Sequence, residues 1–265
     1  MTGSVRIALG LEYDGSAYAG WQTQRATASI QTLLEAALAP VADEPVNLIC
    51  AGRTDAGVHA RAQVTHFDTQ ARRTARGWVL GANTNLPADV SVAWAREVPR
   101  HFHARYSAEA RTYRYYVFNR SVRAALAARG ATWIRHPLDH ERMRAAAGEL
   151  KGSHDFSAFC SAQSQSGSSI RRVDELTVQR AGDFVIIEAT ANAFLHHMVR
   201  NIAGTLIAVG QGEADALSIR RALQSKDRSQ AGPTAPPQGL YLWSVRYPWA
   251  FALPPSRSAI IGPLP

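Results

Sequence analysis

The sequence predicts an α+β fold built from two ferredoxin-like (split βαβ) halves, whose strands form a largely antiparallel sheet with helices on one face. Apolar residues recur with a period of two in some segments, as in strands, and with a period near 3.6 in others, as in helices. The expected elements follow the order β-α-β-β-α-β, and the second half of the chain repeats that order. The chain has 265 residues, 46% of them hydrophobic, which is enough to fill the cores of two such halves.

The first half is expected to open with a strand, because apolar residues alternate with polar or small ones from Val5 to Leu11. Ser29 predicts the N-cap of a helix with an amphipathic stripe, and Pro40 is expected to end it. The remaining elements of this half are expected as strands at 46–50 and about 62–68, a short helix at 75–82 and a strand at 90–97.

The second half is expected to begin with a strand at 111–118, which is dense in aromatic and β-branched residues. Asp139 predicts the cap of a helix, and the turn at Gly182 predicts a hairpin of strands 172–179 and 184–190. The last elements are expected as a longer helix with an apolar stripe from Leu195 to Leu206, a short helix after Ser218 and a strand from Leu240 to Tyr247.

The domain boundary is expected near 104–110. We therefore predict an N-terminal α+β domain at 1–106, a C-terminal α+β domain at 107–249 and a loosely ordered tail at 250–265. The Ser/Gln-rich run at 161–169 and the Pro/Gly-rich run at 229–239 are expected to be loops.

The composition indicates a polyanionic partner. The net charge is +8, and neutralising phosphates with release of counterions drives the binding of nucleic acids. All but two of the 29 basic residues are arginines, which suit phosphates and base stacking, although codon bias alone also produces such a ratio. The two cysteines lie far apart without a CxxC motif, which fits a reducing cytoplasm. No apolar run approaches the roughly 20 residues of a membrane helix, and no signal peptide is expected.

The segment from Cys50 to Ala60 is the leading candidate site. Gly52 and Gly57 bracket Asp55, and glycine allows a backbone to take positive φ or to approach another segment closely. The neighbouring Arg53 would keep the Asp55 carboxylate ionised, ready to act as a nucleophile or a general base. The alternative is a tight turn in which Asp55 caps the backbone.

Two residues of the second half are further candidates. Tyr113 lies in a strand where rings alternate with guanidinium groups, as a base-stacking platform requires, although burial in the sheet core is the alternative for any single tyrosine. Arg200 is expected on the longer helix, one helical step from His196 and from Gly204, where a solvated arginine is the alternative.

Histidines do not predict a metal centre. His101, His103, His196 and His197 lack HExxH spacing and have no close acidic or cysteine partner, so ordinary core or surface histidines are expected. Neither a GxGxxG fingerprint nor a P-loop is present, so no dinucleotide or nucleotide cofactor is expected.

These residues resemble the tRNA pseudouridine synthase A family along nearly the whole chain. The shared motifs occur in the family's order, and their combination is far more specific than any one of them. They are Tyr13-Asp-Gly15 with Gly20-Trp-Gln22, Gly52-Arg-Thr-Asp-Ala-Gly-Val-His59, Phe102-His-Ala-Arg105, Tyr113-Arg-Tyr115, His154-Asp-Phe-Ser157, His197-Met-Val-Arg-Asn201 with Gly204-Thr-Leu206, and Thr234-Ala-Pro236 with Gly239-Leu-Tyr241.

The resemblance implies an enzyme that isomerises uridine to pseudouridine at positions 38, 39 and 40 of the tRNA anticodon stem-loop. It implies Asp55 as the catalytic carboxylate and Tyr113 as the residue that stacks on the target base. Arg53 and Arg200 would be the basic residues that orient the aspartate. It also implies a homodimer whose tRNA contacts both subunits, with no metal and no organic cofactor.

The reaction is compatible with a lone ionised carboxylate, which could attack C1′, add to the uracil ring or abstract the 2′ proton. Two other classes of protein are less compatible with these residues. An RNA-binding module with exposed aromatics would have no use for Asp55 in a glycine-bracketed loop. A glycoside hydrolase would require a second carboxylate, for which Asp14 is the only candidate in the motifs, and Asp14 is expected to form a turn.

Overall fold

Two units, each a sheet with helices packed against it, make up the computed structural model, which describes residues 3–24, 27–161 and 167–255. The first unit comprises the described residues up to 109 together with 242–255, and the second comprises those from 110 to 241. The domain limits 1–106 and 107–249 stay a prediction; these units differ from them mainly because 242–255 group with the first unit. Most of the tail, and part of the Ser/Gln-rich loop, lie outside the described residues.

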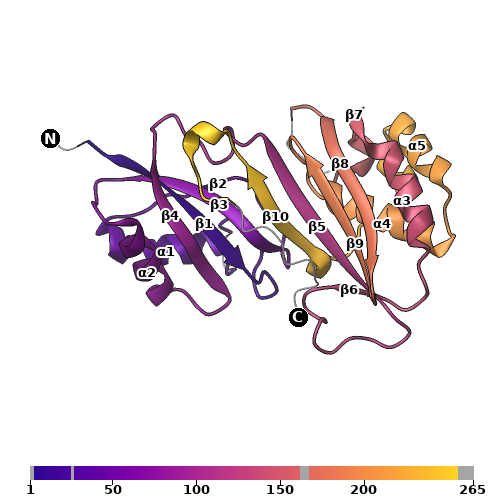
Figure 1. Cartoon of the computed structure of the whole chain (residues 1–265), viewed down its shortest axis with the longest axis horizontal. Helices are drawn as coiled ribbons and strands as arrows, with labels where there is room; N and C mark the ends of the chain where they lie inside the picture. The colour runs from indigo at the N-terminus through magenta and orange to yellow at the C-terminus, as the bar shows by residue number, and fades with distance from the viewer. Residues whose placement is uncertain (1–2, 25–26, 162–166, 256–265) are drawn as a thin grey trace. The chain divides into compact units, whose positions relative to one another are not determined.

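The first unit has the predicted β-α-β-β-α-β order (Figure 1). Strand β1 pairs antiparallel with both β3 and β4, and β2 pairs with the other edge of β3, giving the order β4-β1-β3-β2. The two helices pack against each other, and α2 packs on β4. The bounds are β1 Val5–Tyr13, α1 Ile30–Ala42, β2 Ile49–Cys50, β3 His59–Thr69, α2 Ala75–Asn85 and β4 Val90–Val98.

The core of the first unit fills the space between its sheet and its helices. Trp78 of α2 is buried against Phe67 of β3, edge to face with ring centroids 5.3 Å apart. The side chain of Asn83 accepts a hydrogen bond from the backbone N–H of Val92 and donates one to its carbonyl, which ties α2 to β4.

Two sequence predictions in this unit need correction. Pro40 does not end α1, which continues to Ala42 before Asp43 takes a left-handed conformation. Proline's fixed φ is itself helical, and near a helix end its missing N–H costs one hydrogen bond. The strand expected at 46–50 forms only at Ile49–Cys50, because the N–H of Leu48 donates to the Glu35 carboxylate (2.9 Å) instead of to a neighbouring strand. The Ser29 cap is confirmed, since its hydroxyl accepts from the N–H of Thr32.

The second unit is also mainly antiparallel, in the order β5-β9-β8-β7, with the short β6 parallel to β5. Helices α3, α4 and α5 gather on one side of these strands (Figure 1). The bounds are β5 Ala110–Asn119, β6 Thr132–Ile134, α3 His140–Ala147, β7 Gly152–Asp155, β8 Ile170–Ala181, β9 Phe184–Ala191, α4 Met198–Gln211 and α5 Ala216–Ser225, with 3-10 turns at Gly148–Leu150, Ser157–Phe159, Arg228–Gln230 and Pro237–Gly239. Strand β10 Leu240–Arg246 starts in this unit, but its residues from 242 on and the 3-10 turn Trp249–Phe251 belong to the first unit.

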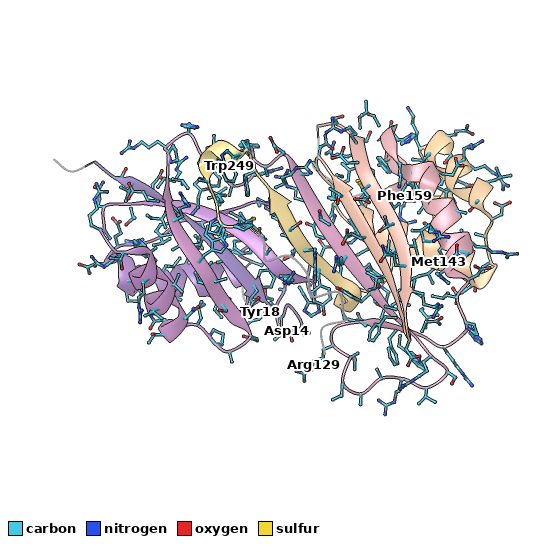
Figure 2. The ribbon with its side chains drawn as sticks, in the orientation of Figure 1. Asp14, Tyr18, Arg129, Met143, Phe159 and Trp249 are labelled. Carbon is cyan, nitrogen blue, oxygen red and sulfur yellow. The ribbon has the colours of Figure 1, made fainter. Side chains whose placement is uncertain are left out.

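Most predictions for the second half are confirmed, including the Asp139 cap and the hairpin at Gly182, whose φ is +58°. Sequence periodicity missed β6 and β7, which are too short to show a pattern. Helix α5 begins before Ser218, because the Asp215 side chain accepts from the N–H of Ser218 and caps it. Met143 of α3 and Phe159, both labelled in Figure 2, are fully buried in the core of this unit.

None of the helices in the described ranges has both the length and the apolar composition needed to cross a membrane.

Candidate active site

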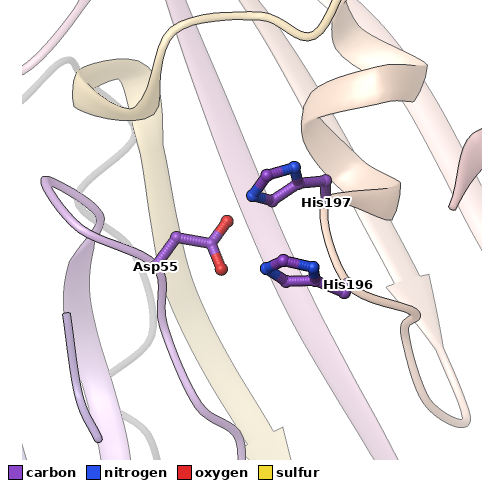
Figure 3. Close-up of side chains that lie close together, drawn as sticks. All are labelled: Asp55, His196 and His197. Atoms are coloured by element: carbon purple, nitrogen blue, oxygen red, sulfur yellow. The ribbon is translucent and has the colours of Figure 1, made fainter. Parts of the chain in front are cut away.

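Asp55 lies on the loop that joins β2 to β3 in the first unit (Figure 3). The N–H of Ala51 donates to the carbonyl of Val64 (2.8 Å), and the amide of Gln63 donates to the carbonyl of Gly52 (2.7 Å). The carbonyl of Asp55 accepts from the N–H of Val58 (3.1 Å), which closes a turn. The Asp55 side chain is thus half-buried on a backbone fixed at both ends.

A second loop packs backbone to backbone against this one. Gly20 has a φ of +93°, and a Cβ there would lie 2.5 Å from the carbonyl oxygen of Thr54. A Cβ on Gly15 would lie 2.0 Å from the carbonyl oxygen of Val58. The N–H of Trp21 donates to the carbonyl of Thr54 (2.9 Å), which holds the two loops together. Only glycine fits these two positions, so the site depends on them as well as on the glycines that bracket Asp55.

The glycine that follows Asp55 behaves as the sequence predicts. Gly57 has a φ of +74°, and its N–H donates to the carbonyl of Tyr18 (3.2 Å). The loop therefore turns sharply after Asp55, and backbone hydrogen bonds on both sides of that residue fix the position from which its side chain extends.

Thr54, directly before Asp55, is buried, and its hydroxyl is 2.8 Å from that of Tyr13. The Gln63 amide also reaches the Tyr13 hydroxyl, at 3.5 Å. Sequence reasoning missed this polar network under the loop, although Tyr13 stands in a recognised motif. Three separated polar residues carry no periodic signal, so only their positions on β1, the loop and β3 reveal the network.

The structure shows the predicted turn at Asp14 but, among the described residues, no ion pair between Arg53 and Asp55. Arg53 is exposed, and within the described ranges no salt bridge joins it to Asp55. Its charge acts on the Cys50 thiol: burial raises the pKa of this thiol to about 12, and the Arg53 charge lowers it by a smaller amount. Asp14 is a turn former, as predicted, because its carboxylate accepts from both the N–H (2.9 Å) and the hydroxyl (2.6 Å) of Ser16.

Tyr113 lies on β5 in the second unit, opposite Ala189 of β9. Its ring meets Phe194 edge to face with the centroids 5.1 Å apart, and only 8% of the residue is exposed. The neighbouring Arg111 is also buried and donates to the carbonyl of Asn192 (2.9 Å). Tyr113 is therefore held by packing in a fixed orientation, and its burial agrees with the sheet-core alternative, so its stacking role stays a prediction.

Arg200 lies in the first turn of α4, which begins at Met198 and not at Leu195. His196 precedes the helix and so is not one helical step from Arg200, contrary to the prediction. The Nε of Arg200 donates to the carbonyl of Ala235 (2.8 Å), and the N–H of Ala235 donates back to the carbonyl of Arg200 (3.1 Å).

Gly204 is a point of close packing on α4. A Cβ there would lie 1.7 Å from the carbonyl oxygen of Pro233, so only glycine lets the segment 231–236 lie against the helix. Asn201 reinforces this contact: it is fully buried, and its side-chain oxygen Oδ1 accepts from the Thr234 hydroxyl (2.6 Å) and from Arg228 (3.1 Å). The segment fixes the guanidinium group of Arg200, because the carbonyl of Ala235 accepts from its Nε.

The rings of His196 and His197, directly before α4, lie against each other with their centroids 4.0 Å apart and their planes tilted by 35° (Figure 3). His197 is the N-cap of α4 and has a φ of +62°, which is rare for a residue with a side chain. Such strain persists only where the surroundings enforce it, and it clusters at functional sites.

Known proteins match this chain along most of its length. A family model described as tRNA pseudouridine synthase matches residues 11–107 and 146–248, ranges that include Asp55 and Arg200. A tRNA pseudouridine synthase A of Methylococcus capsulatus is 56% identical over 261 residues, covering 98% of this chain and 96% of that protein. Proteins of the same name from Pseudoalteromonas atlantica (50% over 260 residues, 98% of each chain) and Coxiella burnetii (54% over 249 residues, 94% of this chain and 95% of that protein) are similar to it as well.

The matches cover both units, and the loop that presents Asp55 lies within the matched sequence. Since the family model covers well over half of the chain and the relatives align almost end to end, this chain belongs to the tRNA pseudouridine synthase family.

Proposed function

We propose that this chain isomerises uridine to pseudouridine at positions 38, 39 and 40 in the anticodon stem-loop of tRNA, with Asp55 as the essential catalytic carboxylate. Membership of the tRNA pseudouridine synthase family supports the reaction. The observation that carries the role of Asp55 is the backbone clamp around its loop, which needs Gly15 and Gly20 to close. A chain that only bound RNA would have no use for one carboxylate held so firmly.

The chemistry needs little beyond an ionised carboxylate and a held base. The C1′–N1 bond of uridine breaks and a C1′–C5 bond forms; C5 loses its proton and N1 gains one, so no electron and no water is consumed. An aspartate supplies the nucleophile or the base for each of the three routes named above. Fixing it before substrate arrives avoids reorganisation during the reaction.

The substrate-binding roles of Tyr113, Arg53 and Arg200 belong to the same proposal. Packing against Phe194 orients the Tyr113 ring, which we propose to stack on the base taken out of its helix. The net charge of +8 suits tRNA as the partner. We further propose a homodimer, as the resemblance implies, that acts in the cytoplasm, as the two distant cysteines indicate.

Asp55→Asn tests the catalytic role. The variant is expected to lose tritium release from [5-³H]uridine-labelled tRNA on the order of a thousandfold or more, because the amide can neither attack nor accept a proton. Its affinity for tRNA, measured by filter binding, should change less than a few-fold. Asp43→Asn is the matched control and is expected to stay active, since Asp43 is exposed after α1 and asparagine tolerates its left-handed conformation. Full activity in Asp55→Asn would refute the assignment.

The site of modification is tested with anticodon stem-loops that carry uridine at only one of positions 38, 39 or 40. Tritium release from each of the three is the expected result. Release from none of them, with release from another tRNA region, would replace the proposed substrate site while leaving the isomerase assignment intact.

A further inference from the structure

The segment that joins β5 to α3 in the second unit has a marked excess of positive charge. Figure 1 shows it as the long loop below β6. Between Asn119 and Leu138 the chain has no aspartate and no glutamate, and it has four arginines: Arg120, Arg123, Arg129 and Arg135. We name residues 120–135 the arginine loop, and we propose that it binds the sugar-phosphate backbone of tRNA. This inference rests on the proposed function, because it assigns a further contact surface for the same substrate.

The arginines of the loop are presented to solvent. Arg123 and Arg135 are exposed, and in the described part of the chain neither forms an ion pair with an acidic side chain. Arg120 lies over the Phe118 ring, 4.7 Å from its centroid, and 3.5 Å from the Asp183 carboxylate, with both charged groups about half exposed. Exposed guanidinium groups of this kind form bidentate contacts with phosphates.

Apolar side chains are exposed on the same loop. Leu126 is 92% exposed and Val122 is 64% exposed, and the Trp133 ring is partly exposed as well. Single exposed apolar residues are ordinary, but three within twelve residues of an arginine-rich loop indicate a surface that a partner covers. The faces of ribose and of unpaired bases are apolar enough to cover them.

Hydrogen bonds hold the loop in place despite this exposure. The indole N–H of Trp133 donates to the carbonyl of Arg120 (2.8 Å), which closes the base of the loop. The Tyr241 hydroxyl donates to the carbonyl of Gly130 (2.9 Å), and a Cβ on Gly130 would lie 2.6 Å from that hydroxyl. The N–H of Ala131 donates to the carbonyl of Ala127 (3.0 Å). A surface already ordered loses less conformational entropy on binding.

Charge favours RNA over a second copy of the chain as the partner. A symmetric contact centred on this loop would bring arginines against arginines, since both copies present the same surface. A phosphate backbone instead brings negative charge to this surface. Long irregular loops in compact units are usually functional, which agrees with a binding role.

The test compares two double variants that each remove two exposed positive charges. Arg123→Ala/Arg135→Ala removes them from the arginine loop, and Arg76→Ala/Arg96→Ala removes them from α2 and β4 of the first unit. Binding of unmodified tRNA to the full chain is measured at several salt concentrations. For the loop variant we expect affinity to fall on the order of tenfold near 0.1 M salt, and the slope of log K against log salt to shrink by about 0.7 to 0.9 per arginine. The control variant should keep most of its affinity for tRNA and most of the salt slope.

Leu126→Ala tests the apolar contact separately. It should weaken binding by a few-fold at all salt concentrations and leave the slope unchanged, because no charge is removed. Steady-state tritium release should show a raised KM and an unchanged kcat for the loop variants, since the arginine loop is not part of the catalytic machinery.

An unchanged affinity and slope in Arg123→Ala/Arg135→Ala would overturn the proposal, as would equal losses in both double variants. Unchanged tRNA binding together with a lowered oligomeric state in light scattering would also overturn it and would make the loop a protein interface. Absence of tritium release in the unmutated chain would contradict the proposed function. The salt dependence of tRNA binding would still test, independently, whether the arginine loop contacts phosphates.

Discussion

Asp55 depends on neighbours that never touch its carboxylate. The side chain of Gln63 and the close approach of Gly20 hold the backbone of its loop. The hydroxyl of the buried Thr54, the residue before Asp55, forms a hydrogen bond with the Tyr13 hydroxyl. Changes at these positions would move the loop. A lost contact of this kind lowers activity through geometry, since a shift of about 1 Å in a reacting group can cost a hundredfold in rate.

Tyr113 offers a test of ring stacking that separates the ring from the volume it fills. Tyr113→Phe keeps the ring, so turnover in the tritium assay should stay within about tenfold of the unmutated chain. Tyr113→Leu keeps much of the apolar volume and removes the ring, so turnover should fall well below that of the Phe variant. Equal turnover in the two variants, at matched fractions folded, would return Tyr113 to a packing role.

His66 should make the stability of the protein depend on pH. Burial lowers its pKa to about 4, with the charges of Arg6 and His103 acting in the same direction, whereas the unfolded chain takes a proton near pH 6.5. Its Nδ1 accepts from the N–H of Ala104 (3.1 Å), which fits a neutral ring. The stabilisation is therefore complete above about pH 6.5 and is lost as the pH falls towards 4, on the order of 3 kcal/mol in total.

Urea unfolding at pH 7 and pH 4.5 measures that loss. His66→Asn should flatten the pH dependence, because the Asn carbonyl oxygen replaces Nδ1 as an acceptor and does not titrate. His101→Asn is the control, since His101 is exposed. If His66→Asn and the unmutated chain lose the same free energy of unfolding between these two pH values, the pH dependence has another source.

At the scale of elements, α4 and the segment 231–236 act as one piece. Gly204 leaves room for the segment to approach the helix. The N–H of Gly232 donates to the Thr205 hydroxyl (2.9 Å), and the Thr234 hydroxyl donates to the side chain of Asn201. These contacts position the Ala235 carbonyl, which accepts a hydrogen bond from the Nε of Arg200. The conformation of Arg200 thus depends on three positions that bear no charge.

Gly204→Ala tests this coupling. Alanine favours a helix, yet its Cβ would meet the Pro233 carbonyl, so we expect destabilisation of about 1 to 3 kcal/mol and a lowered kcat. Gly148→Ala is the matched control: it has helical dihedral angles and open space around the new Cβ, so it should be neutral or stabilising by about 0.4 to 1 kcal/mol. Thermal unfolding and single-turnover tritium release measure both effects. A neutral Gly204→Ala would show that the segment can move aside at no cost.

At the scale of the whole molecule, we predict that the purified chain forms the proposed homodimer. Light scattering of the purified chain at micromolar concentration should give twice the mass of one chain, and dilution should reduce mass and tritium release together. A monomer with full activity would contradict it. The net charge of +8 opposes self-association, so the dimer should tighten as salt rises, whereas tRNA binding should weaken.

Much of the fold could be predicted because long elements carry periodic signals. The alternation from Val5 to Leu11 and the stripe after Ser29 each repeat one residue environment many times, and β1 and α1 follow. The errors fall where a single contact decides: Glu35 takes the N–H of Leu48, and Asp215 starts α5 early. A side chain distant in sequence, or a cap competing with a pattern, leaves no periodic trace.

The sequence by itself determined the element order, the charge and the motif around Asp55, because all of these are local or summed properties of the residues. Only the tertiary structure decided why that motif contains its glycines: Gly20 makes room for the Thr54 carbonyl and Gly15 for that of Val58. Tertiary structure also decided that Arg53 points to solvent and that the first turn of α4 holds Arg200 against Ala235. Contacts between segments far apart in the chain set these positions, and such contacts exist only once the chain has folded.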